Sequence, residues 1–246
     1  MFGKNPLSKP DLGDGATLWM QEVFGTIQGE GPLAGTPAIF CRVSGCGLKC
    51  VMCDTDFSSS TWHPTLDEIM GRIDTLRFDV AAQLIVLTGG EPLRQNVVPL
   101  LRRCLDSGYT VQIETAGYIW PSGMNDPDIE LALIDKRIVI VCSPKTGTVV
   151  KNVQRWCRDY KLIVGRDGND AHGLPAKSTQ IVDKDDVLFR PPAGTAQIWL
   201  QPREEYYPDG SRNPDRTLVN MKAAAELCMR HGYRLSLQTH KILGLR

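Results

Sequence analysis

The pattern of apolar and polar positions predicts short strands that alternate with amphipathic helices along most of the chain. Residues 83–88 (QLIVLT) form a nearly continuous apolar run, which is typical of a strand in a parallel sheet covered on both faces. Further short β-rich segments lie at 38–44, 109–115, 137–143, 159–164, 196–201 and 233–238. Strands that alternate with helices indicate βαβ units and a parallel sheet.

Helices are predicted between several of these strands. Thr65 and Glu68 have the spacing of a capping box, and apolar residues follow at helical intervals. A second apolar stripe spans 97–105, and further helices are expected over 149–157 and 217–230. At least six strands, two of them joined without a clear helix, fit a partial TIM-like α/β barrel better than a closed eightfold one.

The chain is expected to consist of a tail, a single domain and two insertions in that domain. Residues 1–17 are rich in Pro, Gly, Lys and Asp and lack periodicity, so we expect a loose N-terminal tail. Residues 18–246 are expected to form the domain. The stretches 121–128 and 165–194 are interpreted as surface insertions, the second because of its Gly, Asp and Pro content.

Composition narrows the classes of function. The 246 residues are 42% hydrophobic and 23% charged, values typical of a folded globular protein. Lys and Arg together number 28, as do Asp and Glu, and this zero net charge argues against general binding of nucleic acids. The apolar runs are too short to span a bilayer and no secretory signal is visible, so we expect a cytoplasmic protein without a membrane partner.

Cysteines are the first chemical signal. The chain has eight, of which Cys41, Cys46, Cys50 and Cys53 lie close together. Without an export signal, a metal or redox site is favoured over a disulfide framework. The last three of these cysteines follow a predicted strand, at the end of the strand where α/β barrels build active sites. Three thiolates can hold three irons of a [4Fe–4S] cube and leave the fourth iron for a ligand.

Zinc is the alternative for this cysteine cluster. Structural zinc takes four ligands, and Cys41 or His63 would have to supply the fourth. If Arg42 faces the barrel interior, strand alternation turns Cys41 the other way, towards the helices. The spacing therefore favours an iron–sulfur cluster, with zinc left open.

The three cysteines have the C-x3-C-x2-C spacing that resembles the signature of radical S-adenosylmethionine (SAM) enzymes. The residue before the last cysteine, usually aromatic in those enzymes, is Met52 here, and methionine is apolar and polarisable enough to pack against an adenine. Residues 88–92 (TGGEP) end a predicted strand and resemble the motif that contacts the methionine amino group of SAM in these enzymes. Glycines in that motif let the backbone approach a ligand closely.

Further motifs resemble the 7-carboxy-7-deazaguanine synthase family of the queuosine pathway. They are residues 22–31 (EVFGTIQGEG), 40–46 (FCRVSGC), 53–55 (CDT) and 238–241 (QTHK), and the resemblance runs from about Leu18 to the C-terminus. It implies conversion of 6-carboxy-5,6,7,8-tetrahydropterin to 7-carboxy-7-deazaguanine with loss of ammonia. The reduced cluster would cleave SAM to methionine and a 5′-deoxyadenosyl radical, which takes hydrogen from C6. The ring then contracts, the hydrogen returns and SAM is re-formed.

The resemblance also implies roles for the matching positions. Substrate would be bound by Ile27, Gln28, Gly29, Arg42, Thr88 and His240, with Arg42 on the substrate carboxylate. SAM would be bound by Met52, Cys53, Asp54, Gly90, Ser143, Pro144, Lys145, Gln201, Pro202, Arg203 and Glu204. The cluster would be held by Cys46, Cys50 and Cys53, and Mg²⁺ by Thr55. Glu114 is assigned to substrate contact and proton transfer during the rearrangement.

Ordinary structural roles remain open for several of these residues. Gln28 could be a solvated turn residue, Thr88 a strand threonine and Thr55 a turn or N-cap residue. The carboxylate of Glu114 could simply pair with Arg42 or Lys145, the guanidinium of Arg42 could make a surface ion pair, and His240 could be a core histidine. These alternatives differ in which neighbours each side chain contacts.

Two other functions are weighed against this one. A glycyl-radical activase shares the cysteine signature but would need neither a pterin-binding segment at 27–29 nor Mg²⁺ at Thr55. A zinc-stabilised binding module would be colourless, whereas iron–sulfur protein is brown. The favoured enzyme implies a [4Fe–4S] cluster, SAM and Mg²⁺ as cofactors, a one-electron reductant such as flavodoxin as a partner, and a homodimer.

Overall fold

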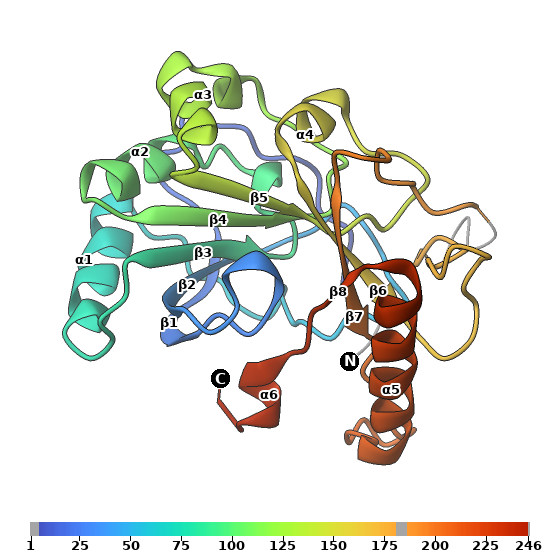
Figure 1. Ribbon diagram of the computed structural model, residues 1–246. Coiled ribbons are helices and arrows are strands. Elements are labelled where there is room, and N and C mark those ends of the chain that lie inside the picture. Colours follow the sequence, from blue (N-terminus) through green and yellow to red (C-terminus); the bar gives the residue numbers. More distant parts are fainter. Residues whose placement is uncertain (1–4, 181–185, 246) are drawn as a thin grey trace.

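The computed structural model describes residues 5–180 and 186–245, and in this part the chain forms an eight-stranded sheet whose strands follow sequence order (Figure 1). The strands are β1 (Met20–Ile27), β2 (Pro37–Val43), β3 (Leu84–Gly89), β4 (Thr110–Thr115), β5 (Ile138–Cys142), β6 (Asp159–Val164), β7 (Gln197–Pro202) and β8 (Arg234–Leu235). Strand β1 pairs antiparallel with β2, and all later pairs are parallel. Among the described residues β1 and β8 do not pair, so the sheet is open and the predicted partial α/β barrel is confirmed.

Helices cover one face of this sheet. They are α1 (Leu66–Arg77), α2 (Val98–Asp106), α3 (Pro127–Ile134), α4 (Lys151–Trp156) and α5 (Pro214–His231), and a short α6 (Thr239–Ile242) follows β8. Single 3₁₀ turns lie at η1 (Gly31–Leu33), η2 (Pro92–Arg94) and η3 (Ser122–Asn125). The capping box predicted at the start of α1 is confirmed, because Thr65 accepts from Glu68 N while its own N–H donates to Glu68 Oε2 at 2.8 Å.

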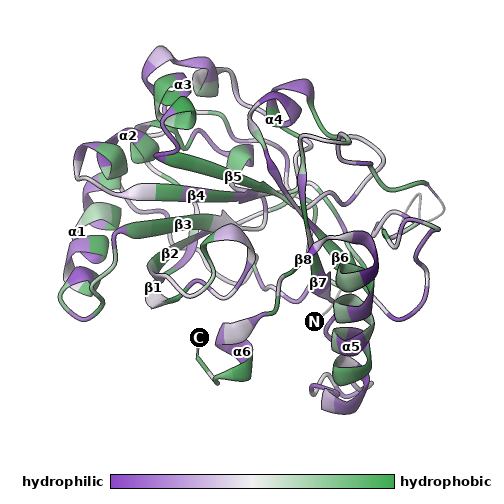
Figure 2. Cartoon of the chain, in the orientation of Figure 1, coloured by the Kyte–Doolittle hydropathy of each residue, from purple (hydrophilic) through white to green (hydrophobic). Residues whose placement is uncertain are grey.

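Side-chain alternation along β2 separates the core from the inner face of the barrel. Ile39, Cys41 and Val43 are buried in the main core under the helices. Phe40 belongs instead to a smaller apolar cluster on the opposite face, and Arg42 lies on that face too. In Figure 2 strands β2 to β5 are largely hydrophobic, as strands buried between helices and barrel interior should be. The expectation that Cys41 and Arg42 point in opposite directions is confirmed.

Several elements differ from the sequence prediction. Strand β1 and helix α6 lie where no strand or helix was expected, and β8 has two residues although a strand was predicted over 233–238. The stretch 121–128, interpreted as an insertion, contains η3 and the start of α3, which has Asp126 as N-cap and proline in its first turn. Among the described residues, no helix lies between β6 and β7, and only the 3₁₀ turn η1 lies between β1 and β2.

The N-terminal residues also differ from the expectation of a loose tail. Of residues 1–17, positions 1–4 lie outside the described residues, and the rest pair with the body of the protein. Ser8 N donates to Cys46 O at 2.8 Å, Asp11 N donates to Arg94 O at 2.8 Å, and Thr17 forms a bridge with Thr65. The cause is a set of long-range hydrogen bonds that no local periodicity reveals. In the described part of the chain, no helix combines the length and apolar character needed to cross a bilayer.

Candidate active site

A cavity of about 560 Å³ opens at the carboxyl ends of the parallel strands. It collects most of the residues that the sequence singled out: Gln28, Arg42, Cys46, Cys50, Met52, Cys53, Asp54, Thr55, Thr88, Gly90, Glu114, Ser143, Lys145, Gln201 and His240. Of the predicted set, Ile27, Gly29, Pro144, Pro202, Arg203 and Glu204 do not line this part of the described structure. Residues from seven separate segments therefore meet at the end of the sheet where α/β barrels carry their active sites.

The cysteine-containing loop follows β2 and is anchored to the end of β3. Glu91 N donates to Gly45 O at 3.0 Å, and Gly90 N donates to Val43 O at 3.2 Å. A side chain at Gly90 would clash with the backbone of Gly45, so glycine is required for this close approach. The two motifs recognised separately in the sequence are thus packed directly against each other.

The three cysteines of this loop fit an iron–sulfur cluster. Cys46 is buried, Cys50 and Cys53 are half-buried, and all three face the same cavity as free thiols. Burial raises the pKa of Cys46 to about 12 and also raises the pKa of Cys53, so binding iron here must displace protons. Within residues 5–180 and 186–245, no three His, Cys, Asp or Glu side chains are arranged so that they could hold one metal ion together. Thiolates that hold a cubane each bind a different iron, whereas the ligands of zinc share one ion.

Cys41 stands apart from these three thiols. Its side chain is fully buried in the core under the helices, close enough to Cys104 of α2 for the two thiols to interact electrostatically. Burial raises the pKa of Cys41 well above its ordinary value. In this position it is a small core residue on the far side of β2 from the cavity.

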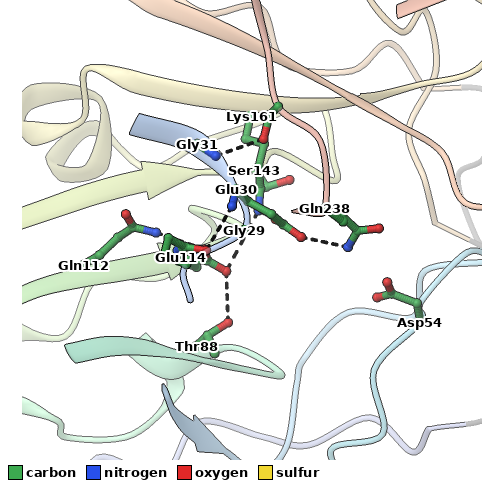
Figure 3. Close-up of polar contacts among 12 residues, drawn as sticks. Gly29, Glu30, Gly31, Asp54, Thr88, Gln112, Glu114, Ser143, Lys161 and Gln238 are labelled. Carbon is green, nitrogen blue, oxygen red and sulfur yellow. Dashed lines mark hydrogen bonds and ion pairs between the residues drawn. The ribbon is translucent and has the colours of Figure 1, made fainter. Parts of the chain in front are cut away.

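Polar side chains form the inner part of the cavity. We call Gln28, Glu30, Glu114 and Lys161, together with Gln112, which lies outside the lining and donates to Glu114, the polar floor. Glu114 accepts hydrogen bonds from Gln28 Nε2 at 3.0 Å and from Gln112 Nε2 at 3.0 Å. Figure 3 shows the Glu114 carboxylate between Gln112 and Thr88, whose hydroxyl donates to it at 3.2 Å. These partners decide the alternatives raised for Glu114, because it pairs with neither Arg42 nor Lys145.

A buried ion pair fixes the polar floor. Lys161 Nζ contacts Glu30 directly and lies 3.9 Å from Glu114 Oε2. Burial alone would raise the pKa of Glu30, but the charge and hydrogen bond of Lys161 lower it overall. Burial would lower the pKa of Lys161, and the carboxylates of Glu114 and Glu30 raise it instead. Both partners are therefore charged, and Gln238 Nε2 adds a 2.7 Å hydrogen bond to Glu30 (Figure 3).

The segment 27–31 carries Gln28 and Glu30 into this floor. The backbone of Gln28 is already used, since its N–H donates to Thr36 O and its carbonyl accepts from Gly35 N. The side-chain amide is used as well, because Oε1 accepts from Glu30 N at 3.1 Å while Nε2 holds Glu114. Gln28 is fully buried, so the alternative of a solvated turn residue does not describe it.

The segment after β8 closes against 27–31. Thr239 N donates to Gly29 O at 3.3 Å. A side chain at Gly29 would clash with the ring of His240, which explains why glycine stands next to that histidine. His240 Nδ1 is buried and has no hydrogen-bond partner among the described residues, and burial lowers the pKa of the ring. A neutral imidazole with one unsatisfied nitrogen therefore faces the cavity.

Charged residues surround the outer part of the cavity. Arg42 Nε pairs with Glu22 Oε1 at 2.9 Å, which orients the guanidinium inside the cavity. Lys241 of α6 contacts both Asp54 Oδ2 and Glu204 Oε2 at 2.6 Å and so links the cysteine-containing loop to the segment after β7. Burial would raise the pKa of Asp54, but Lys241 lowers it overall, so the carboxylate is charged.

The opposite wall is formed by residues after β5 and at the end of β7. Lys145 Nζ donates to Ser143 O at 3.1 Å, and burial lowers the pKa of this lysine. Gln201 Oε1 is buried and lacks a hydrogen-bond partner within the described residues. An unsatisfied acceptor on a cavity wall fits a ligand that carries a donor, which the amino groups of SAM would supply. Arg203 instead pairs with Glu205 at 2.6 Å.

Sequence reasoning assigned no role to several residues that line this cavity, namely Glu22, Phe24, Glu30, Lys161, Gln238 and Lys241. A signal was present for Lys161, which is a charged residue on the inward phase of an otherwise apolar strand. Glu30 lies in the motif at 22–31, and Gln238 and Lys241 lie in the motif at 238–241. Their pairing could not be predicted, because Glu30 and Lys161 are far apart in sequence.

The chain is similar to proteins named 7-carboxy-7-deazaguanine synthase. The one from Rhodospirillum rubrum is 45% identical over 248 residues, covering 100% of both chains. The one from Rickettsia prowazekii is 33% identical over 254 residues, covering 100% of this chain and 96% of the relative. The crystal structure of QueE from Escherichia coli has the same fold, with a TM-score of 0.59, 21% identity and coverage of 90% and 93%. No protein-family model matches the sequence.

Proposed function

The chain belongs to the 7-carboxy-7-deazaguanine synthase family, and we propose that it is a radical SAM lyase that converts 6-carboxy-5,6,7,8-tetrahydropterin to 7-carboxy-7-deazaguanine with release of ammonia. The observation that carries the proposal is one cavity that joins three free cysteines to a charged polar floor. Such a site places a cofactor and a polar heterocycle side by side. Family membership also decides against the activase and the zinc module.

The cofactors fit opposite parts of the cavity. Cys46, Cys50 and Cys53 would hold the [4Fe–4S] cluster. Met52, Cys53, Asp54, Gly90, Ser143, Lys145 and Gln201 would bind SAM. The resemblance adds Pro144, Pro202, Arg203 and Glu204, which do not line the cavity. When bound, cluster and SAM supply a reversible abstraction of hydrogen from the substrate, chemistry that no side chain can perform.

The polar floor and Arg42 would bind the substrate. A pterin presents N–H and amino groups along one edge, and Glu114 offers a charged acceptor for them whose orientation is fixed by Gln28 and Gln112. Arg42 is oriented by Glu22, and its planar guanidinium suits the substrate carboxylate. Thr88, His240 and the 27–29 segment complete the pocket. The heterocycle would thus be held at both ends, which limits the atoms that can react.

Proton movement is assigned to Glu114. Loss of ammonia requires a proton on the departing nitrogen, and Glu114 Oε2 is held by the Thr88 hydroxyl at 3.2 Å with the Lys161 ammonium at 3.9 Å. The carboxylate of Glu114 can accept a proton from the substrate and return it to the departing nitrogen. Lys161 itself would act as a positioning residue through its contacts with Glu30 and Glu114.

Three finer points complete the proposal. Thr55 would be a Mg²⁺ ligand, and its hydroxyl on the cavity wall suits an ion that takes further ligands from substrate and water. A one-electron reductant such as flavodoxin would approach the cysteine-containing loop, where Val51 is 56% exposed. The homodimer is supported by the resemblance alone.

An anaerobic assay tests the proposal. Reconstituted protein, SAM, a reductant and 6-carboxy-5,6,7,8-tetrahydropterin should yield 7-carboxy-7-deazaguanine and ammonia, measured by mass spectrometry. We expect many turnovers per SAM, since the cofactor is re-formed. Brown protein that consumes SAM stoichiometrically and leaves the pterin unchanged would refute the assignment.

A further inference from the structure

Part of the β6–β7 connection packs onto the cysteine-containing loop. Val51 N donates to Thr179 O at 3.0 Å, and Cys50 and Gln180 form an antiparallel bridge. Lys49 N donates to the side-chain oxygen of Gln180 at 2.9 Å. Residues on both sides of Cys50 are thus bonded to two consecutive residues of a segment that is distant in sequence.

The side chain of Gln180 is oriented so that it donates to the Cys50 sulfur. Its Oε1 accepts from Lys49 N, which leaves the amide nitrogen on the other side. That nitrogen, Nε2, lies 3.1 Å from Cys50 Sγ. Because a backbone N–H can only donate, the opposite amide orientation would place two donors against each other. The polarity of the contact is therefore determined by the backbone of the cysteine-containing loop itself.

Thr179 supplies a second donor to the same sulfur. Its hydroxyl lies 3.3 Å from Cys50 Sγ and 3.3 Å from Lys145 O. Lys145 O already accepts from Thr179 N at 3.1 Å and from the Ser178 hydroxyl at 3.0 Å. A carbonyl oxygen has two lone pairs, so the hydroxyl proton of Thr179 is best used on the sulfur.

We propose that Thr179 and Gln180 are positioning residues for the cluster, which hold the Cys50 thiolate in place and raise the reduction potential of the [4Fe–4S] centre. This inference rests on the proposed function, because it requires the cluster. Hydrogen bonds to a ligand sulfur draw electron density away from the iron and favour the state with one more electron. The connection between β6 and β7 would thereby ease the one-electron reduction that brings the cluster into its active state.

Two isosteric or truncating changes test the proposal in the anaerobic holoprotein. Thr179→Val removes the hydroxyl at similar volume, and Gln180→Ala removes the amide. Thr179→Ser keeps the hydroxyl, and Asn169→Ala removes an amide of the same connection that bonds to Gly165 O instead. The readouts are iron and sulfide content and the midpoint potential of the cluster, followed by electron paramagnetic resonance during a redox titration.

We expect Thr179→Val and Gln180→Ala each to lower the midpoint potential, so that the ratio of reduced to oxidised cluster at a fixed solution potential falls severalfold. Thr179→Ser and Asn169→Ala should match the parent. Loss of the cluster in Thr179→Val with retention in Thr179→Ser would equally support a holding role. Unchanged potentials and iron content in both test variants would overturn this inference alone. A parent protein that binds no [4Fe–4S] cluster would overturn the proposed function with it.

Discussion

The cysteine-containing loop and the polar floor are the two halves of one cavity, yet they are held in opposite ways. The loop is partly exposed, with Val51 56% accessible, and is held by hydrogen bonds to Asn5, Ser8, Thr179 and Gln180. The floor is buried, with the Lys161 side chain 8% exposed, and is held by an ion pair within the barrel. Iron loading and electron transfer require that the loop be accessible from solvent. Selective binding of a heterocycle requires hydrogen-bonding groups whose orientation is fixed before the ligand binds.

The largest expected effect is loss of the cluster. Cys46→Ala, Cys50→Ala and Cys53→Ala should each abolish the iron–sulfur absorbance and all activity, since one lost thiolate leaves a second iron without a protein ligand. The circular dichroism of these variants should remain that of a folded protein. Iron analysis of anaerobically purified protein is the measurement.

Cys41→Ala is the matched control for these variants. Its thiol lies under the helices, so this variant should keep the cluster and lose roughly 1 kcal/mol of stability. A variant series in which Cys41→Ala loses iron while Cys46→Ala retains it would contradict the ligand assignment.

A second change, Lys161→Met, should destabilise the polar floor and leave the structure of the cysteine-containing loop unchanged. Lys161→Met would leave the buried carboxylate of Glu30 and the half-buried carboxylate of Glu114 without their cation, which costs about 3–5 kcal/mol. Urea unfolding of the holoprotein should show this loss, while iron content per folded chain stays at the parent value. Lys222→Met, on the exposed side of α5, should change stability by about 0.5 kcal/mol or less. A loss below about 1 kcal/mol in Lys161→Met would show that the pair is not the support described here.

How much of the site could be predicted from the sequence also differs between the cysteine-containing loop and the polar floor. The cysteine-containing loop and the residues at strand ends could be predicted because they form short local motifs, and the alternation of β2 correctly separated Cys41 from Arg42. In the polar floor, Gln28 and Glu114 could also be predicted from their motifs, but the pair of Glu30 and Lys161 could not, because it joins residues far apart in sequence. The loose tail was expected for a related reason, since its bonds to Cys46 and Arg94 leave no periodic trace.

Missed elements have local causes too. Strand β1 has an irregular register between Met20 and Glu22, so its burial pattern does not alternate cleanly. Helix α3 begins with Pro127, which lies in the stretch interpreted as an insertion, and proline is favoured in the first turn of a helix.

A third prediction concerns Arg42, at the border of the two regions, and distinguishes the affinity for substrate from the affinity for SAM. Arg42→Lys keeps the charge but loses the bidentate geometry, so affinity for the carboxylated pterin should fall by about tenfold, equivalent to roughly 1.4 kcal/mol. Affinity for SAM should stay within about twofold, a difference of well under 1 kcal/mol. Calorimetry with each ligand checks this, and equal weakening of both would argue against a carboxylate clamp.

The smallest expected effect concerns Mg²⁺. Activity should rise with Mg²⁺, and Thr55→Ala should reduce that response severalfold while leaving SAM cleavage without substrate unchanged. The reason is that a dication beside the substrate carboxylate limits pivoting of the ring. The ratio of product to abortive 5′-deoxyadenosine measures it. Wild-type turnover of the variant at every Mg²⁺ concentration would show that Thr55 is not a ligand of the metal.

The central claim is that the polar floor recognises the substrate independently of the cofactor half, and Glu114→Gln tests it most directly. Glutamine keeps the shape of the side chain but removes the charge that accepts the heterocycle N–H groups. Calorimetric titration of the anaerobic holoprotein should show substrate affinity lowered by about tenfold to a hundredfold, as expected for charge-assisted hydrogen bonds. Iron content and SAM affinity should match the parent. Parent-like substrate affinity, or an equal loss of SAM affinity, would contradict the account.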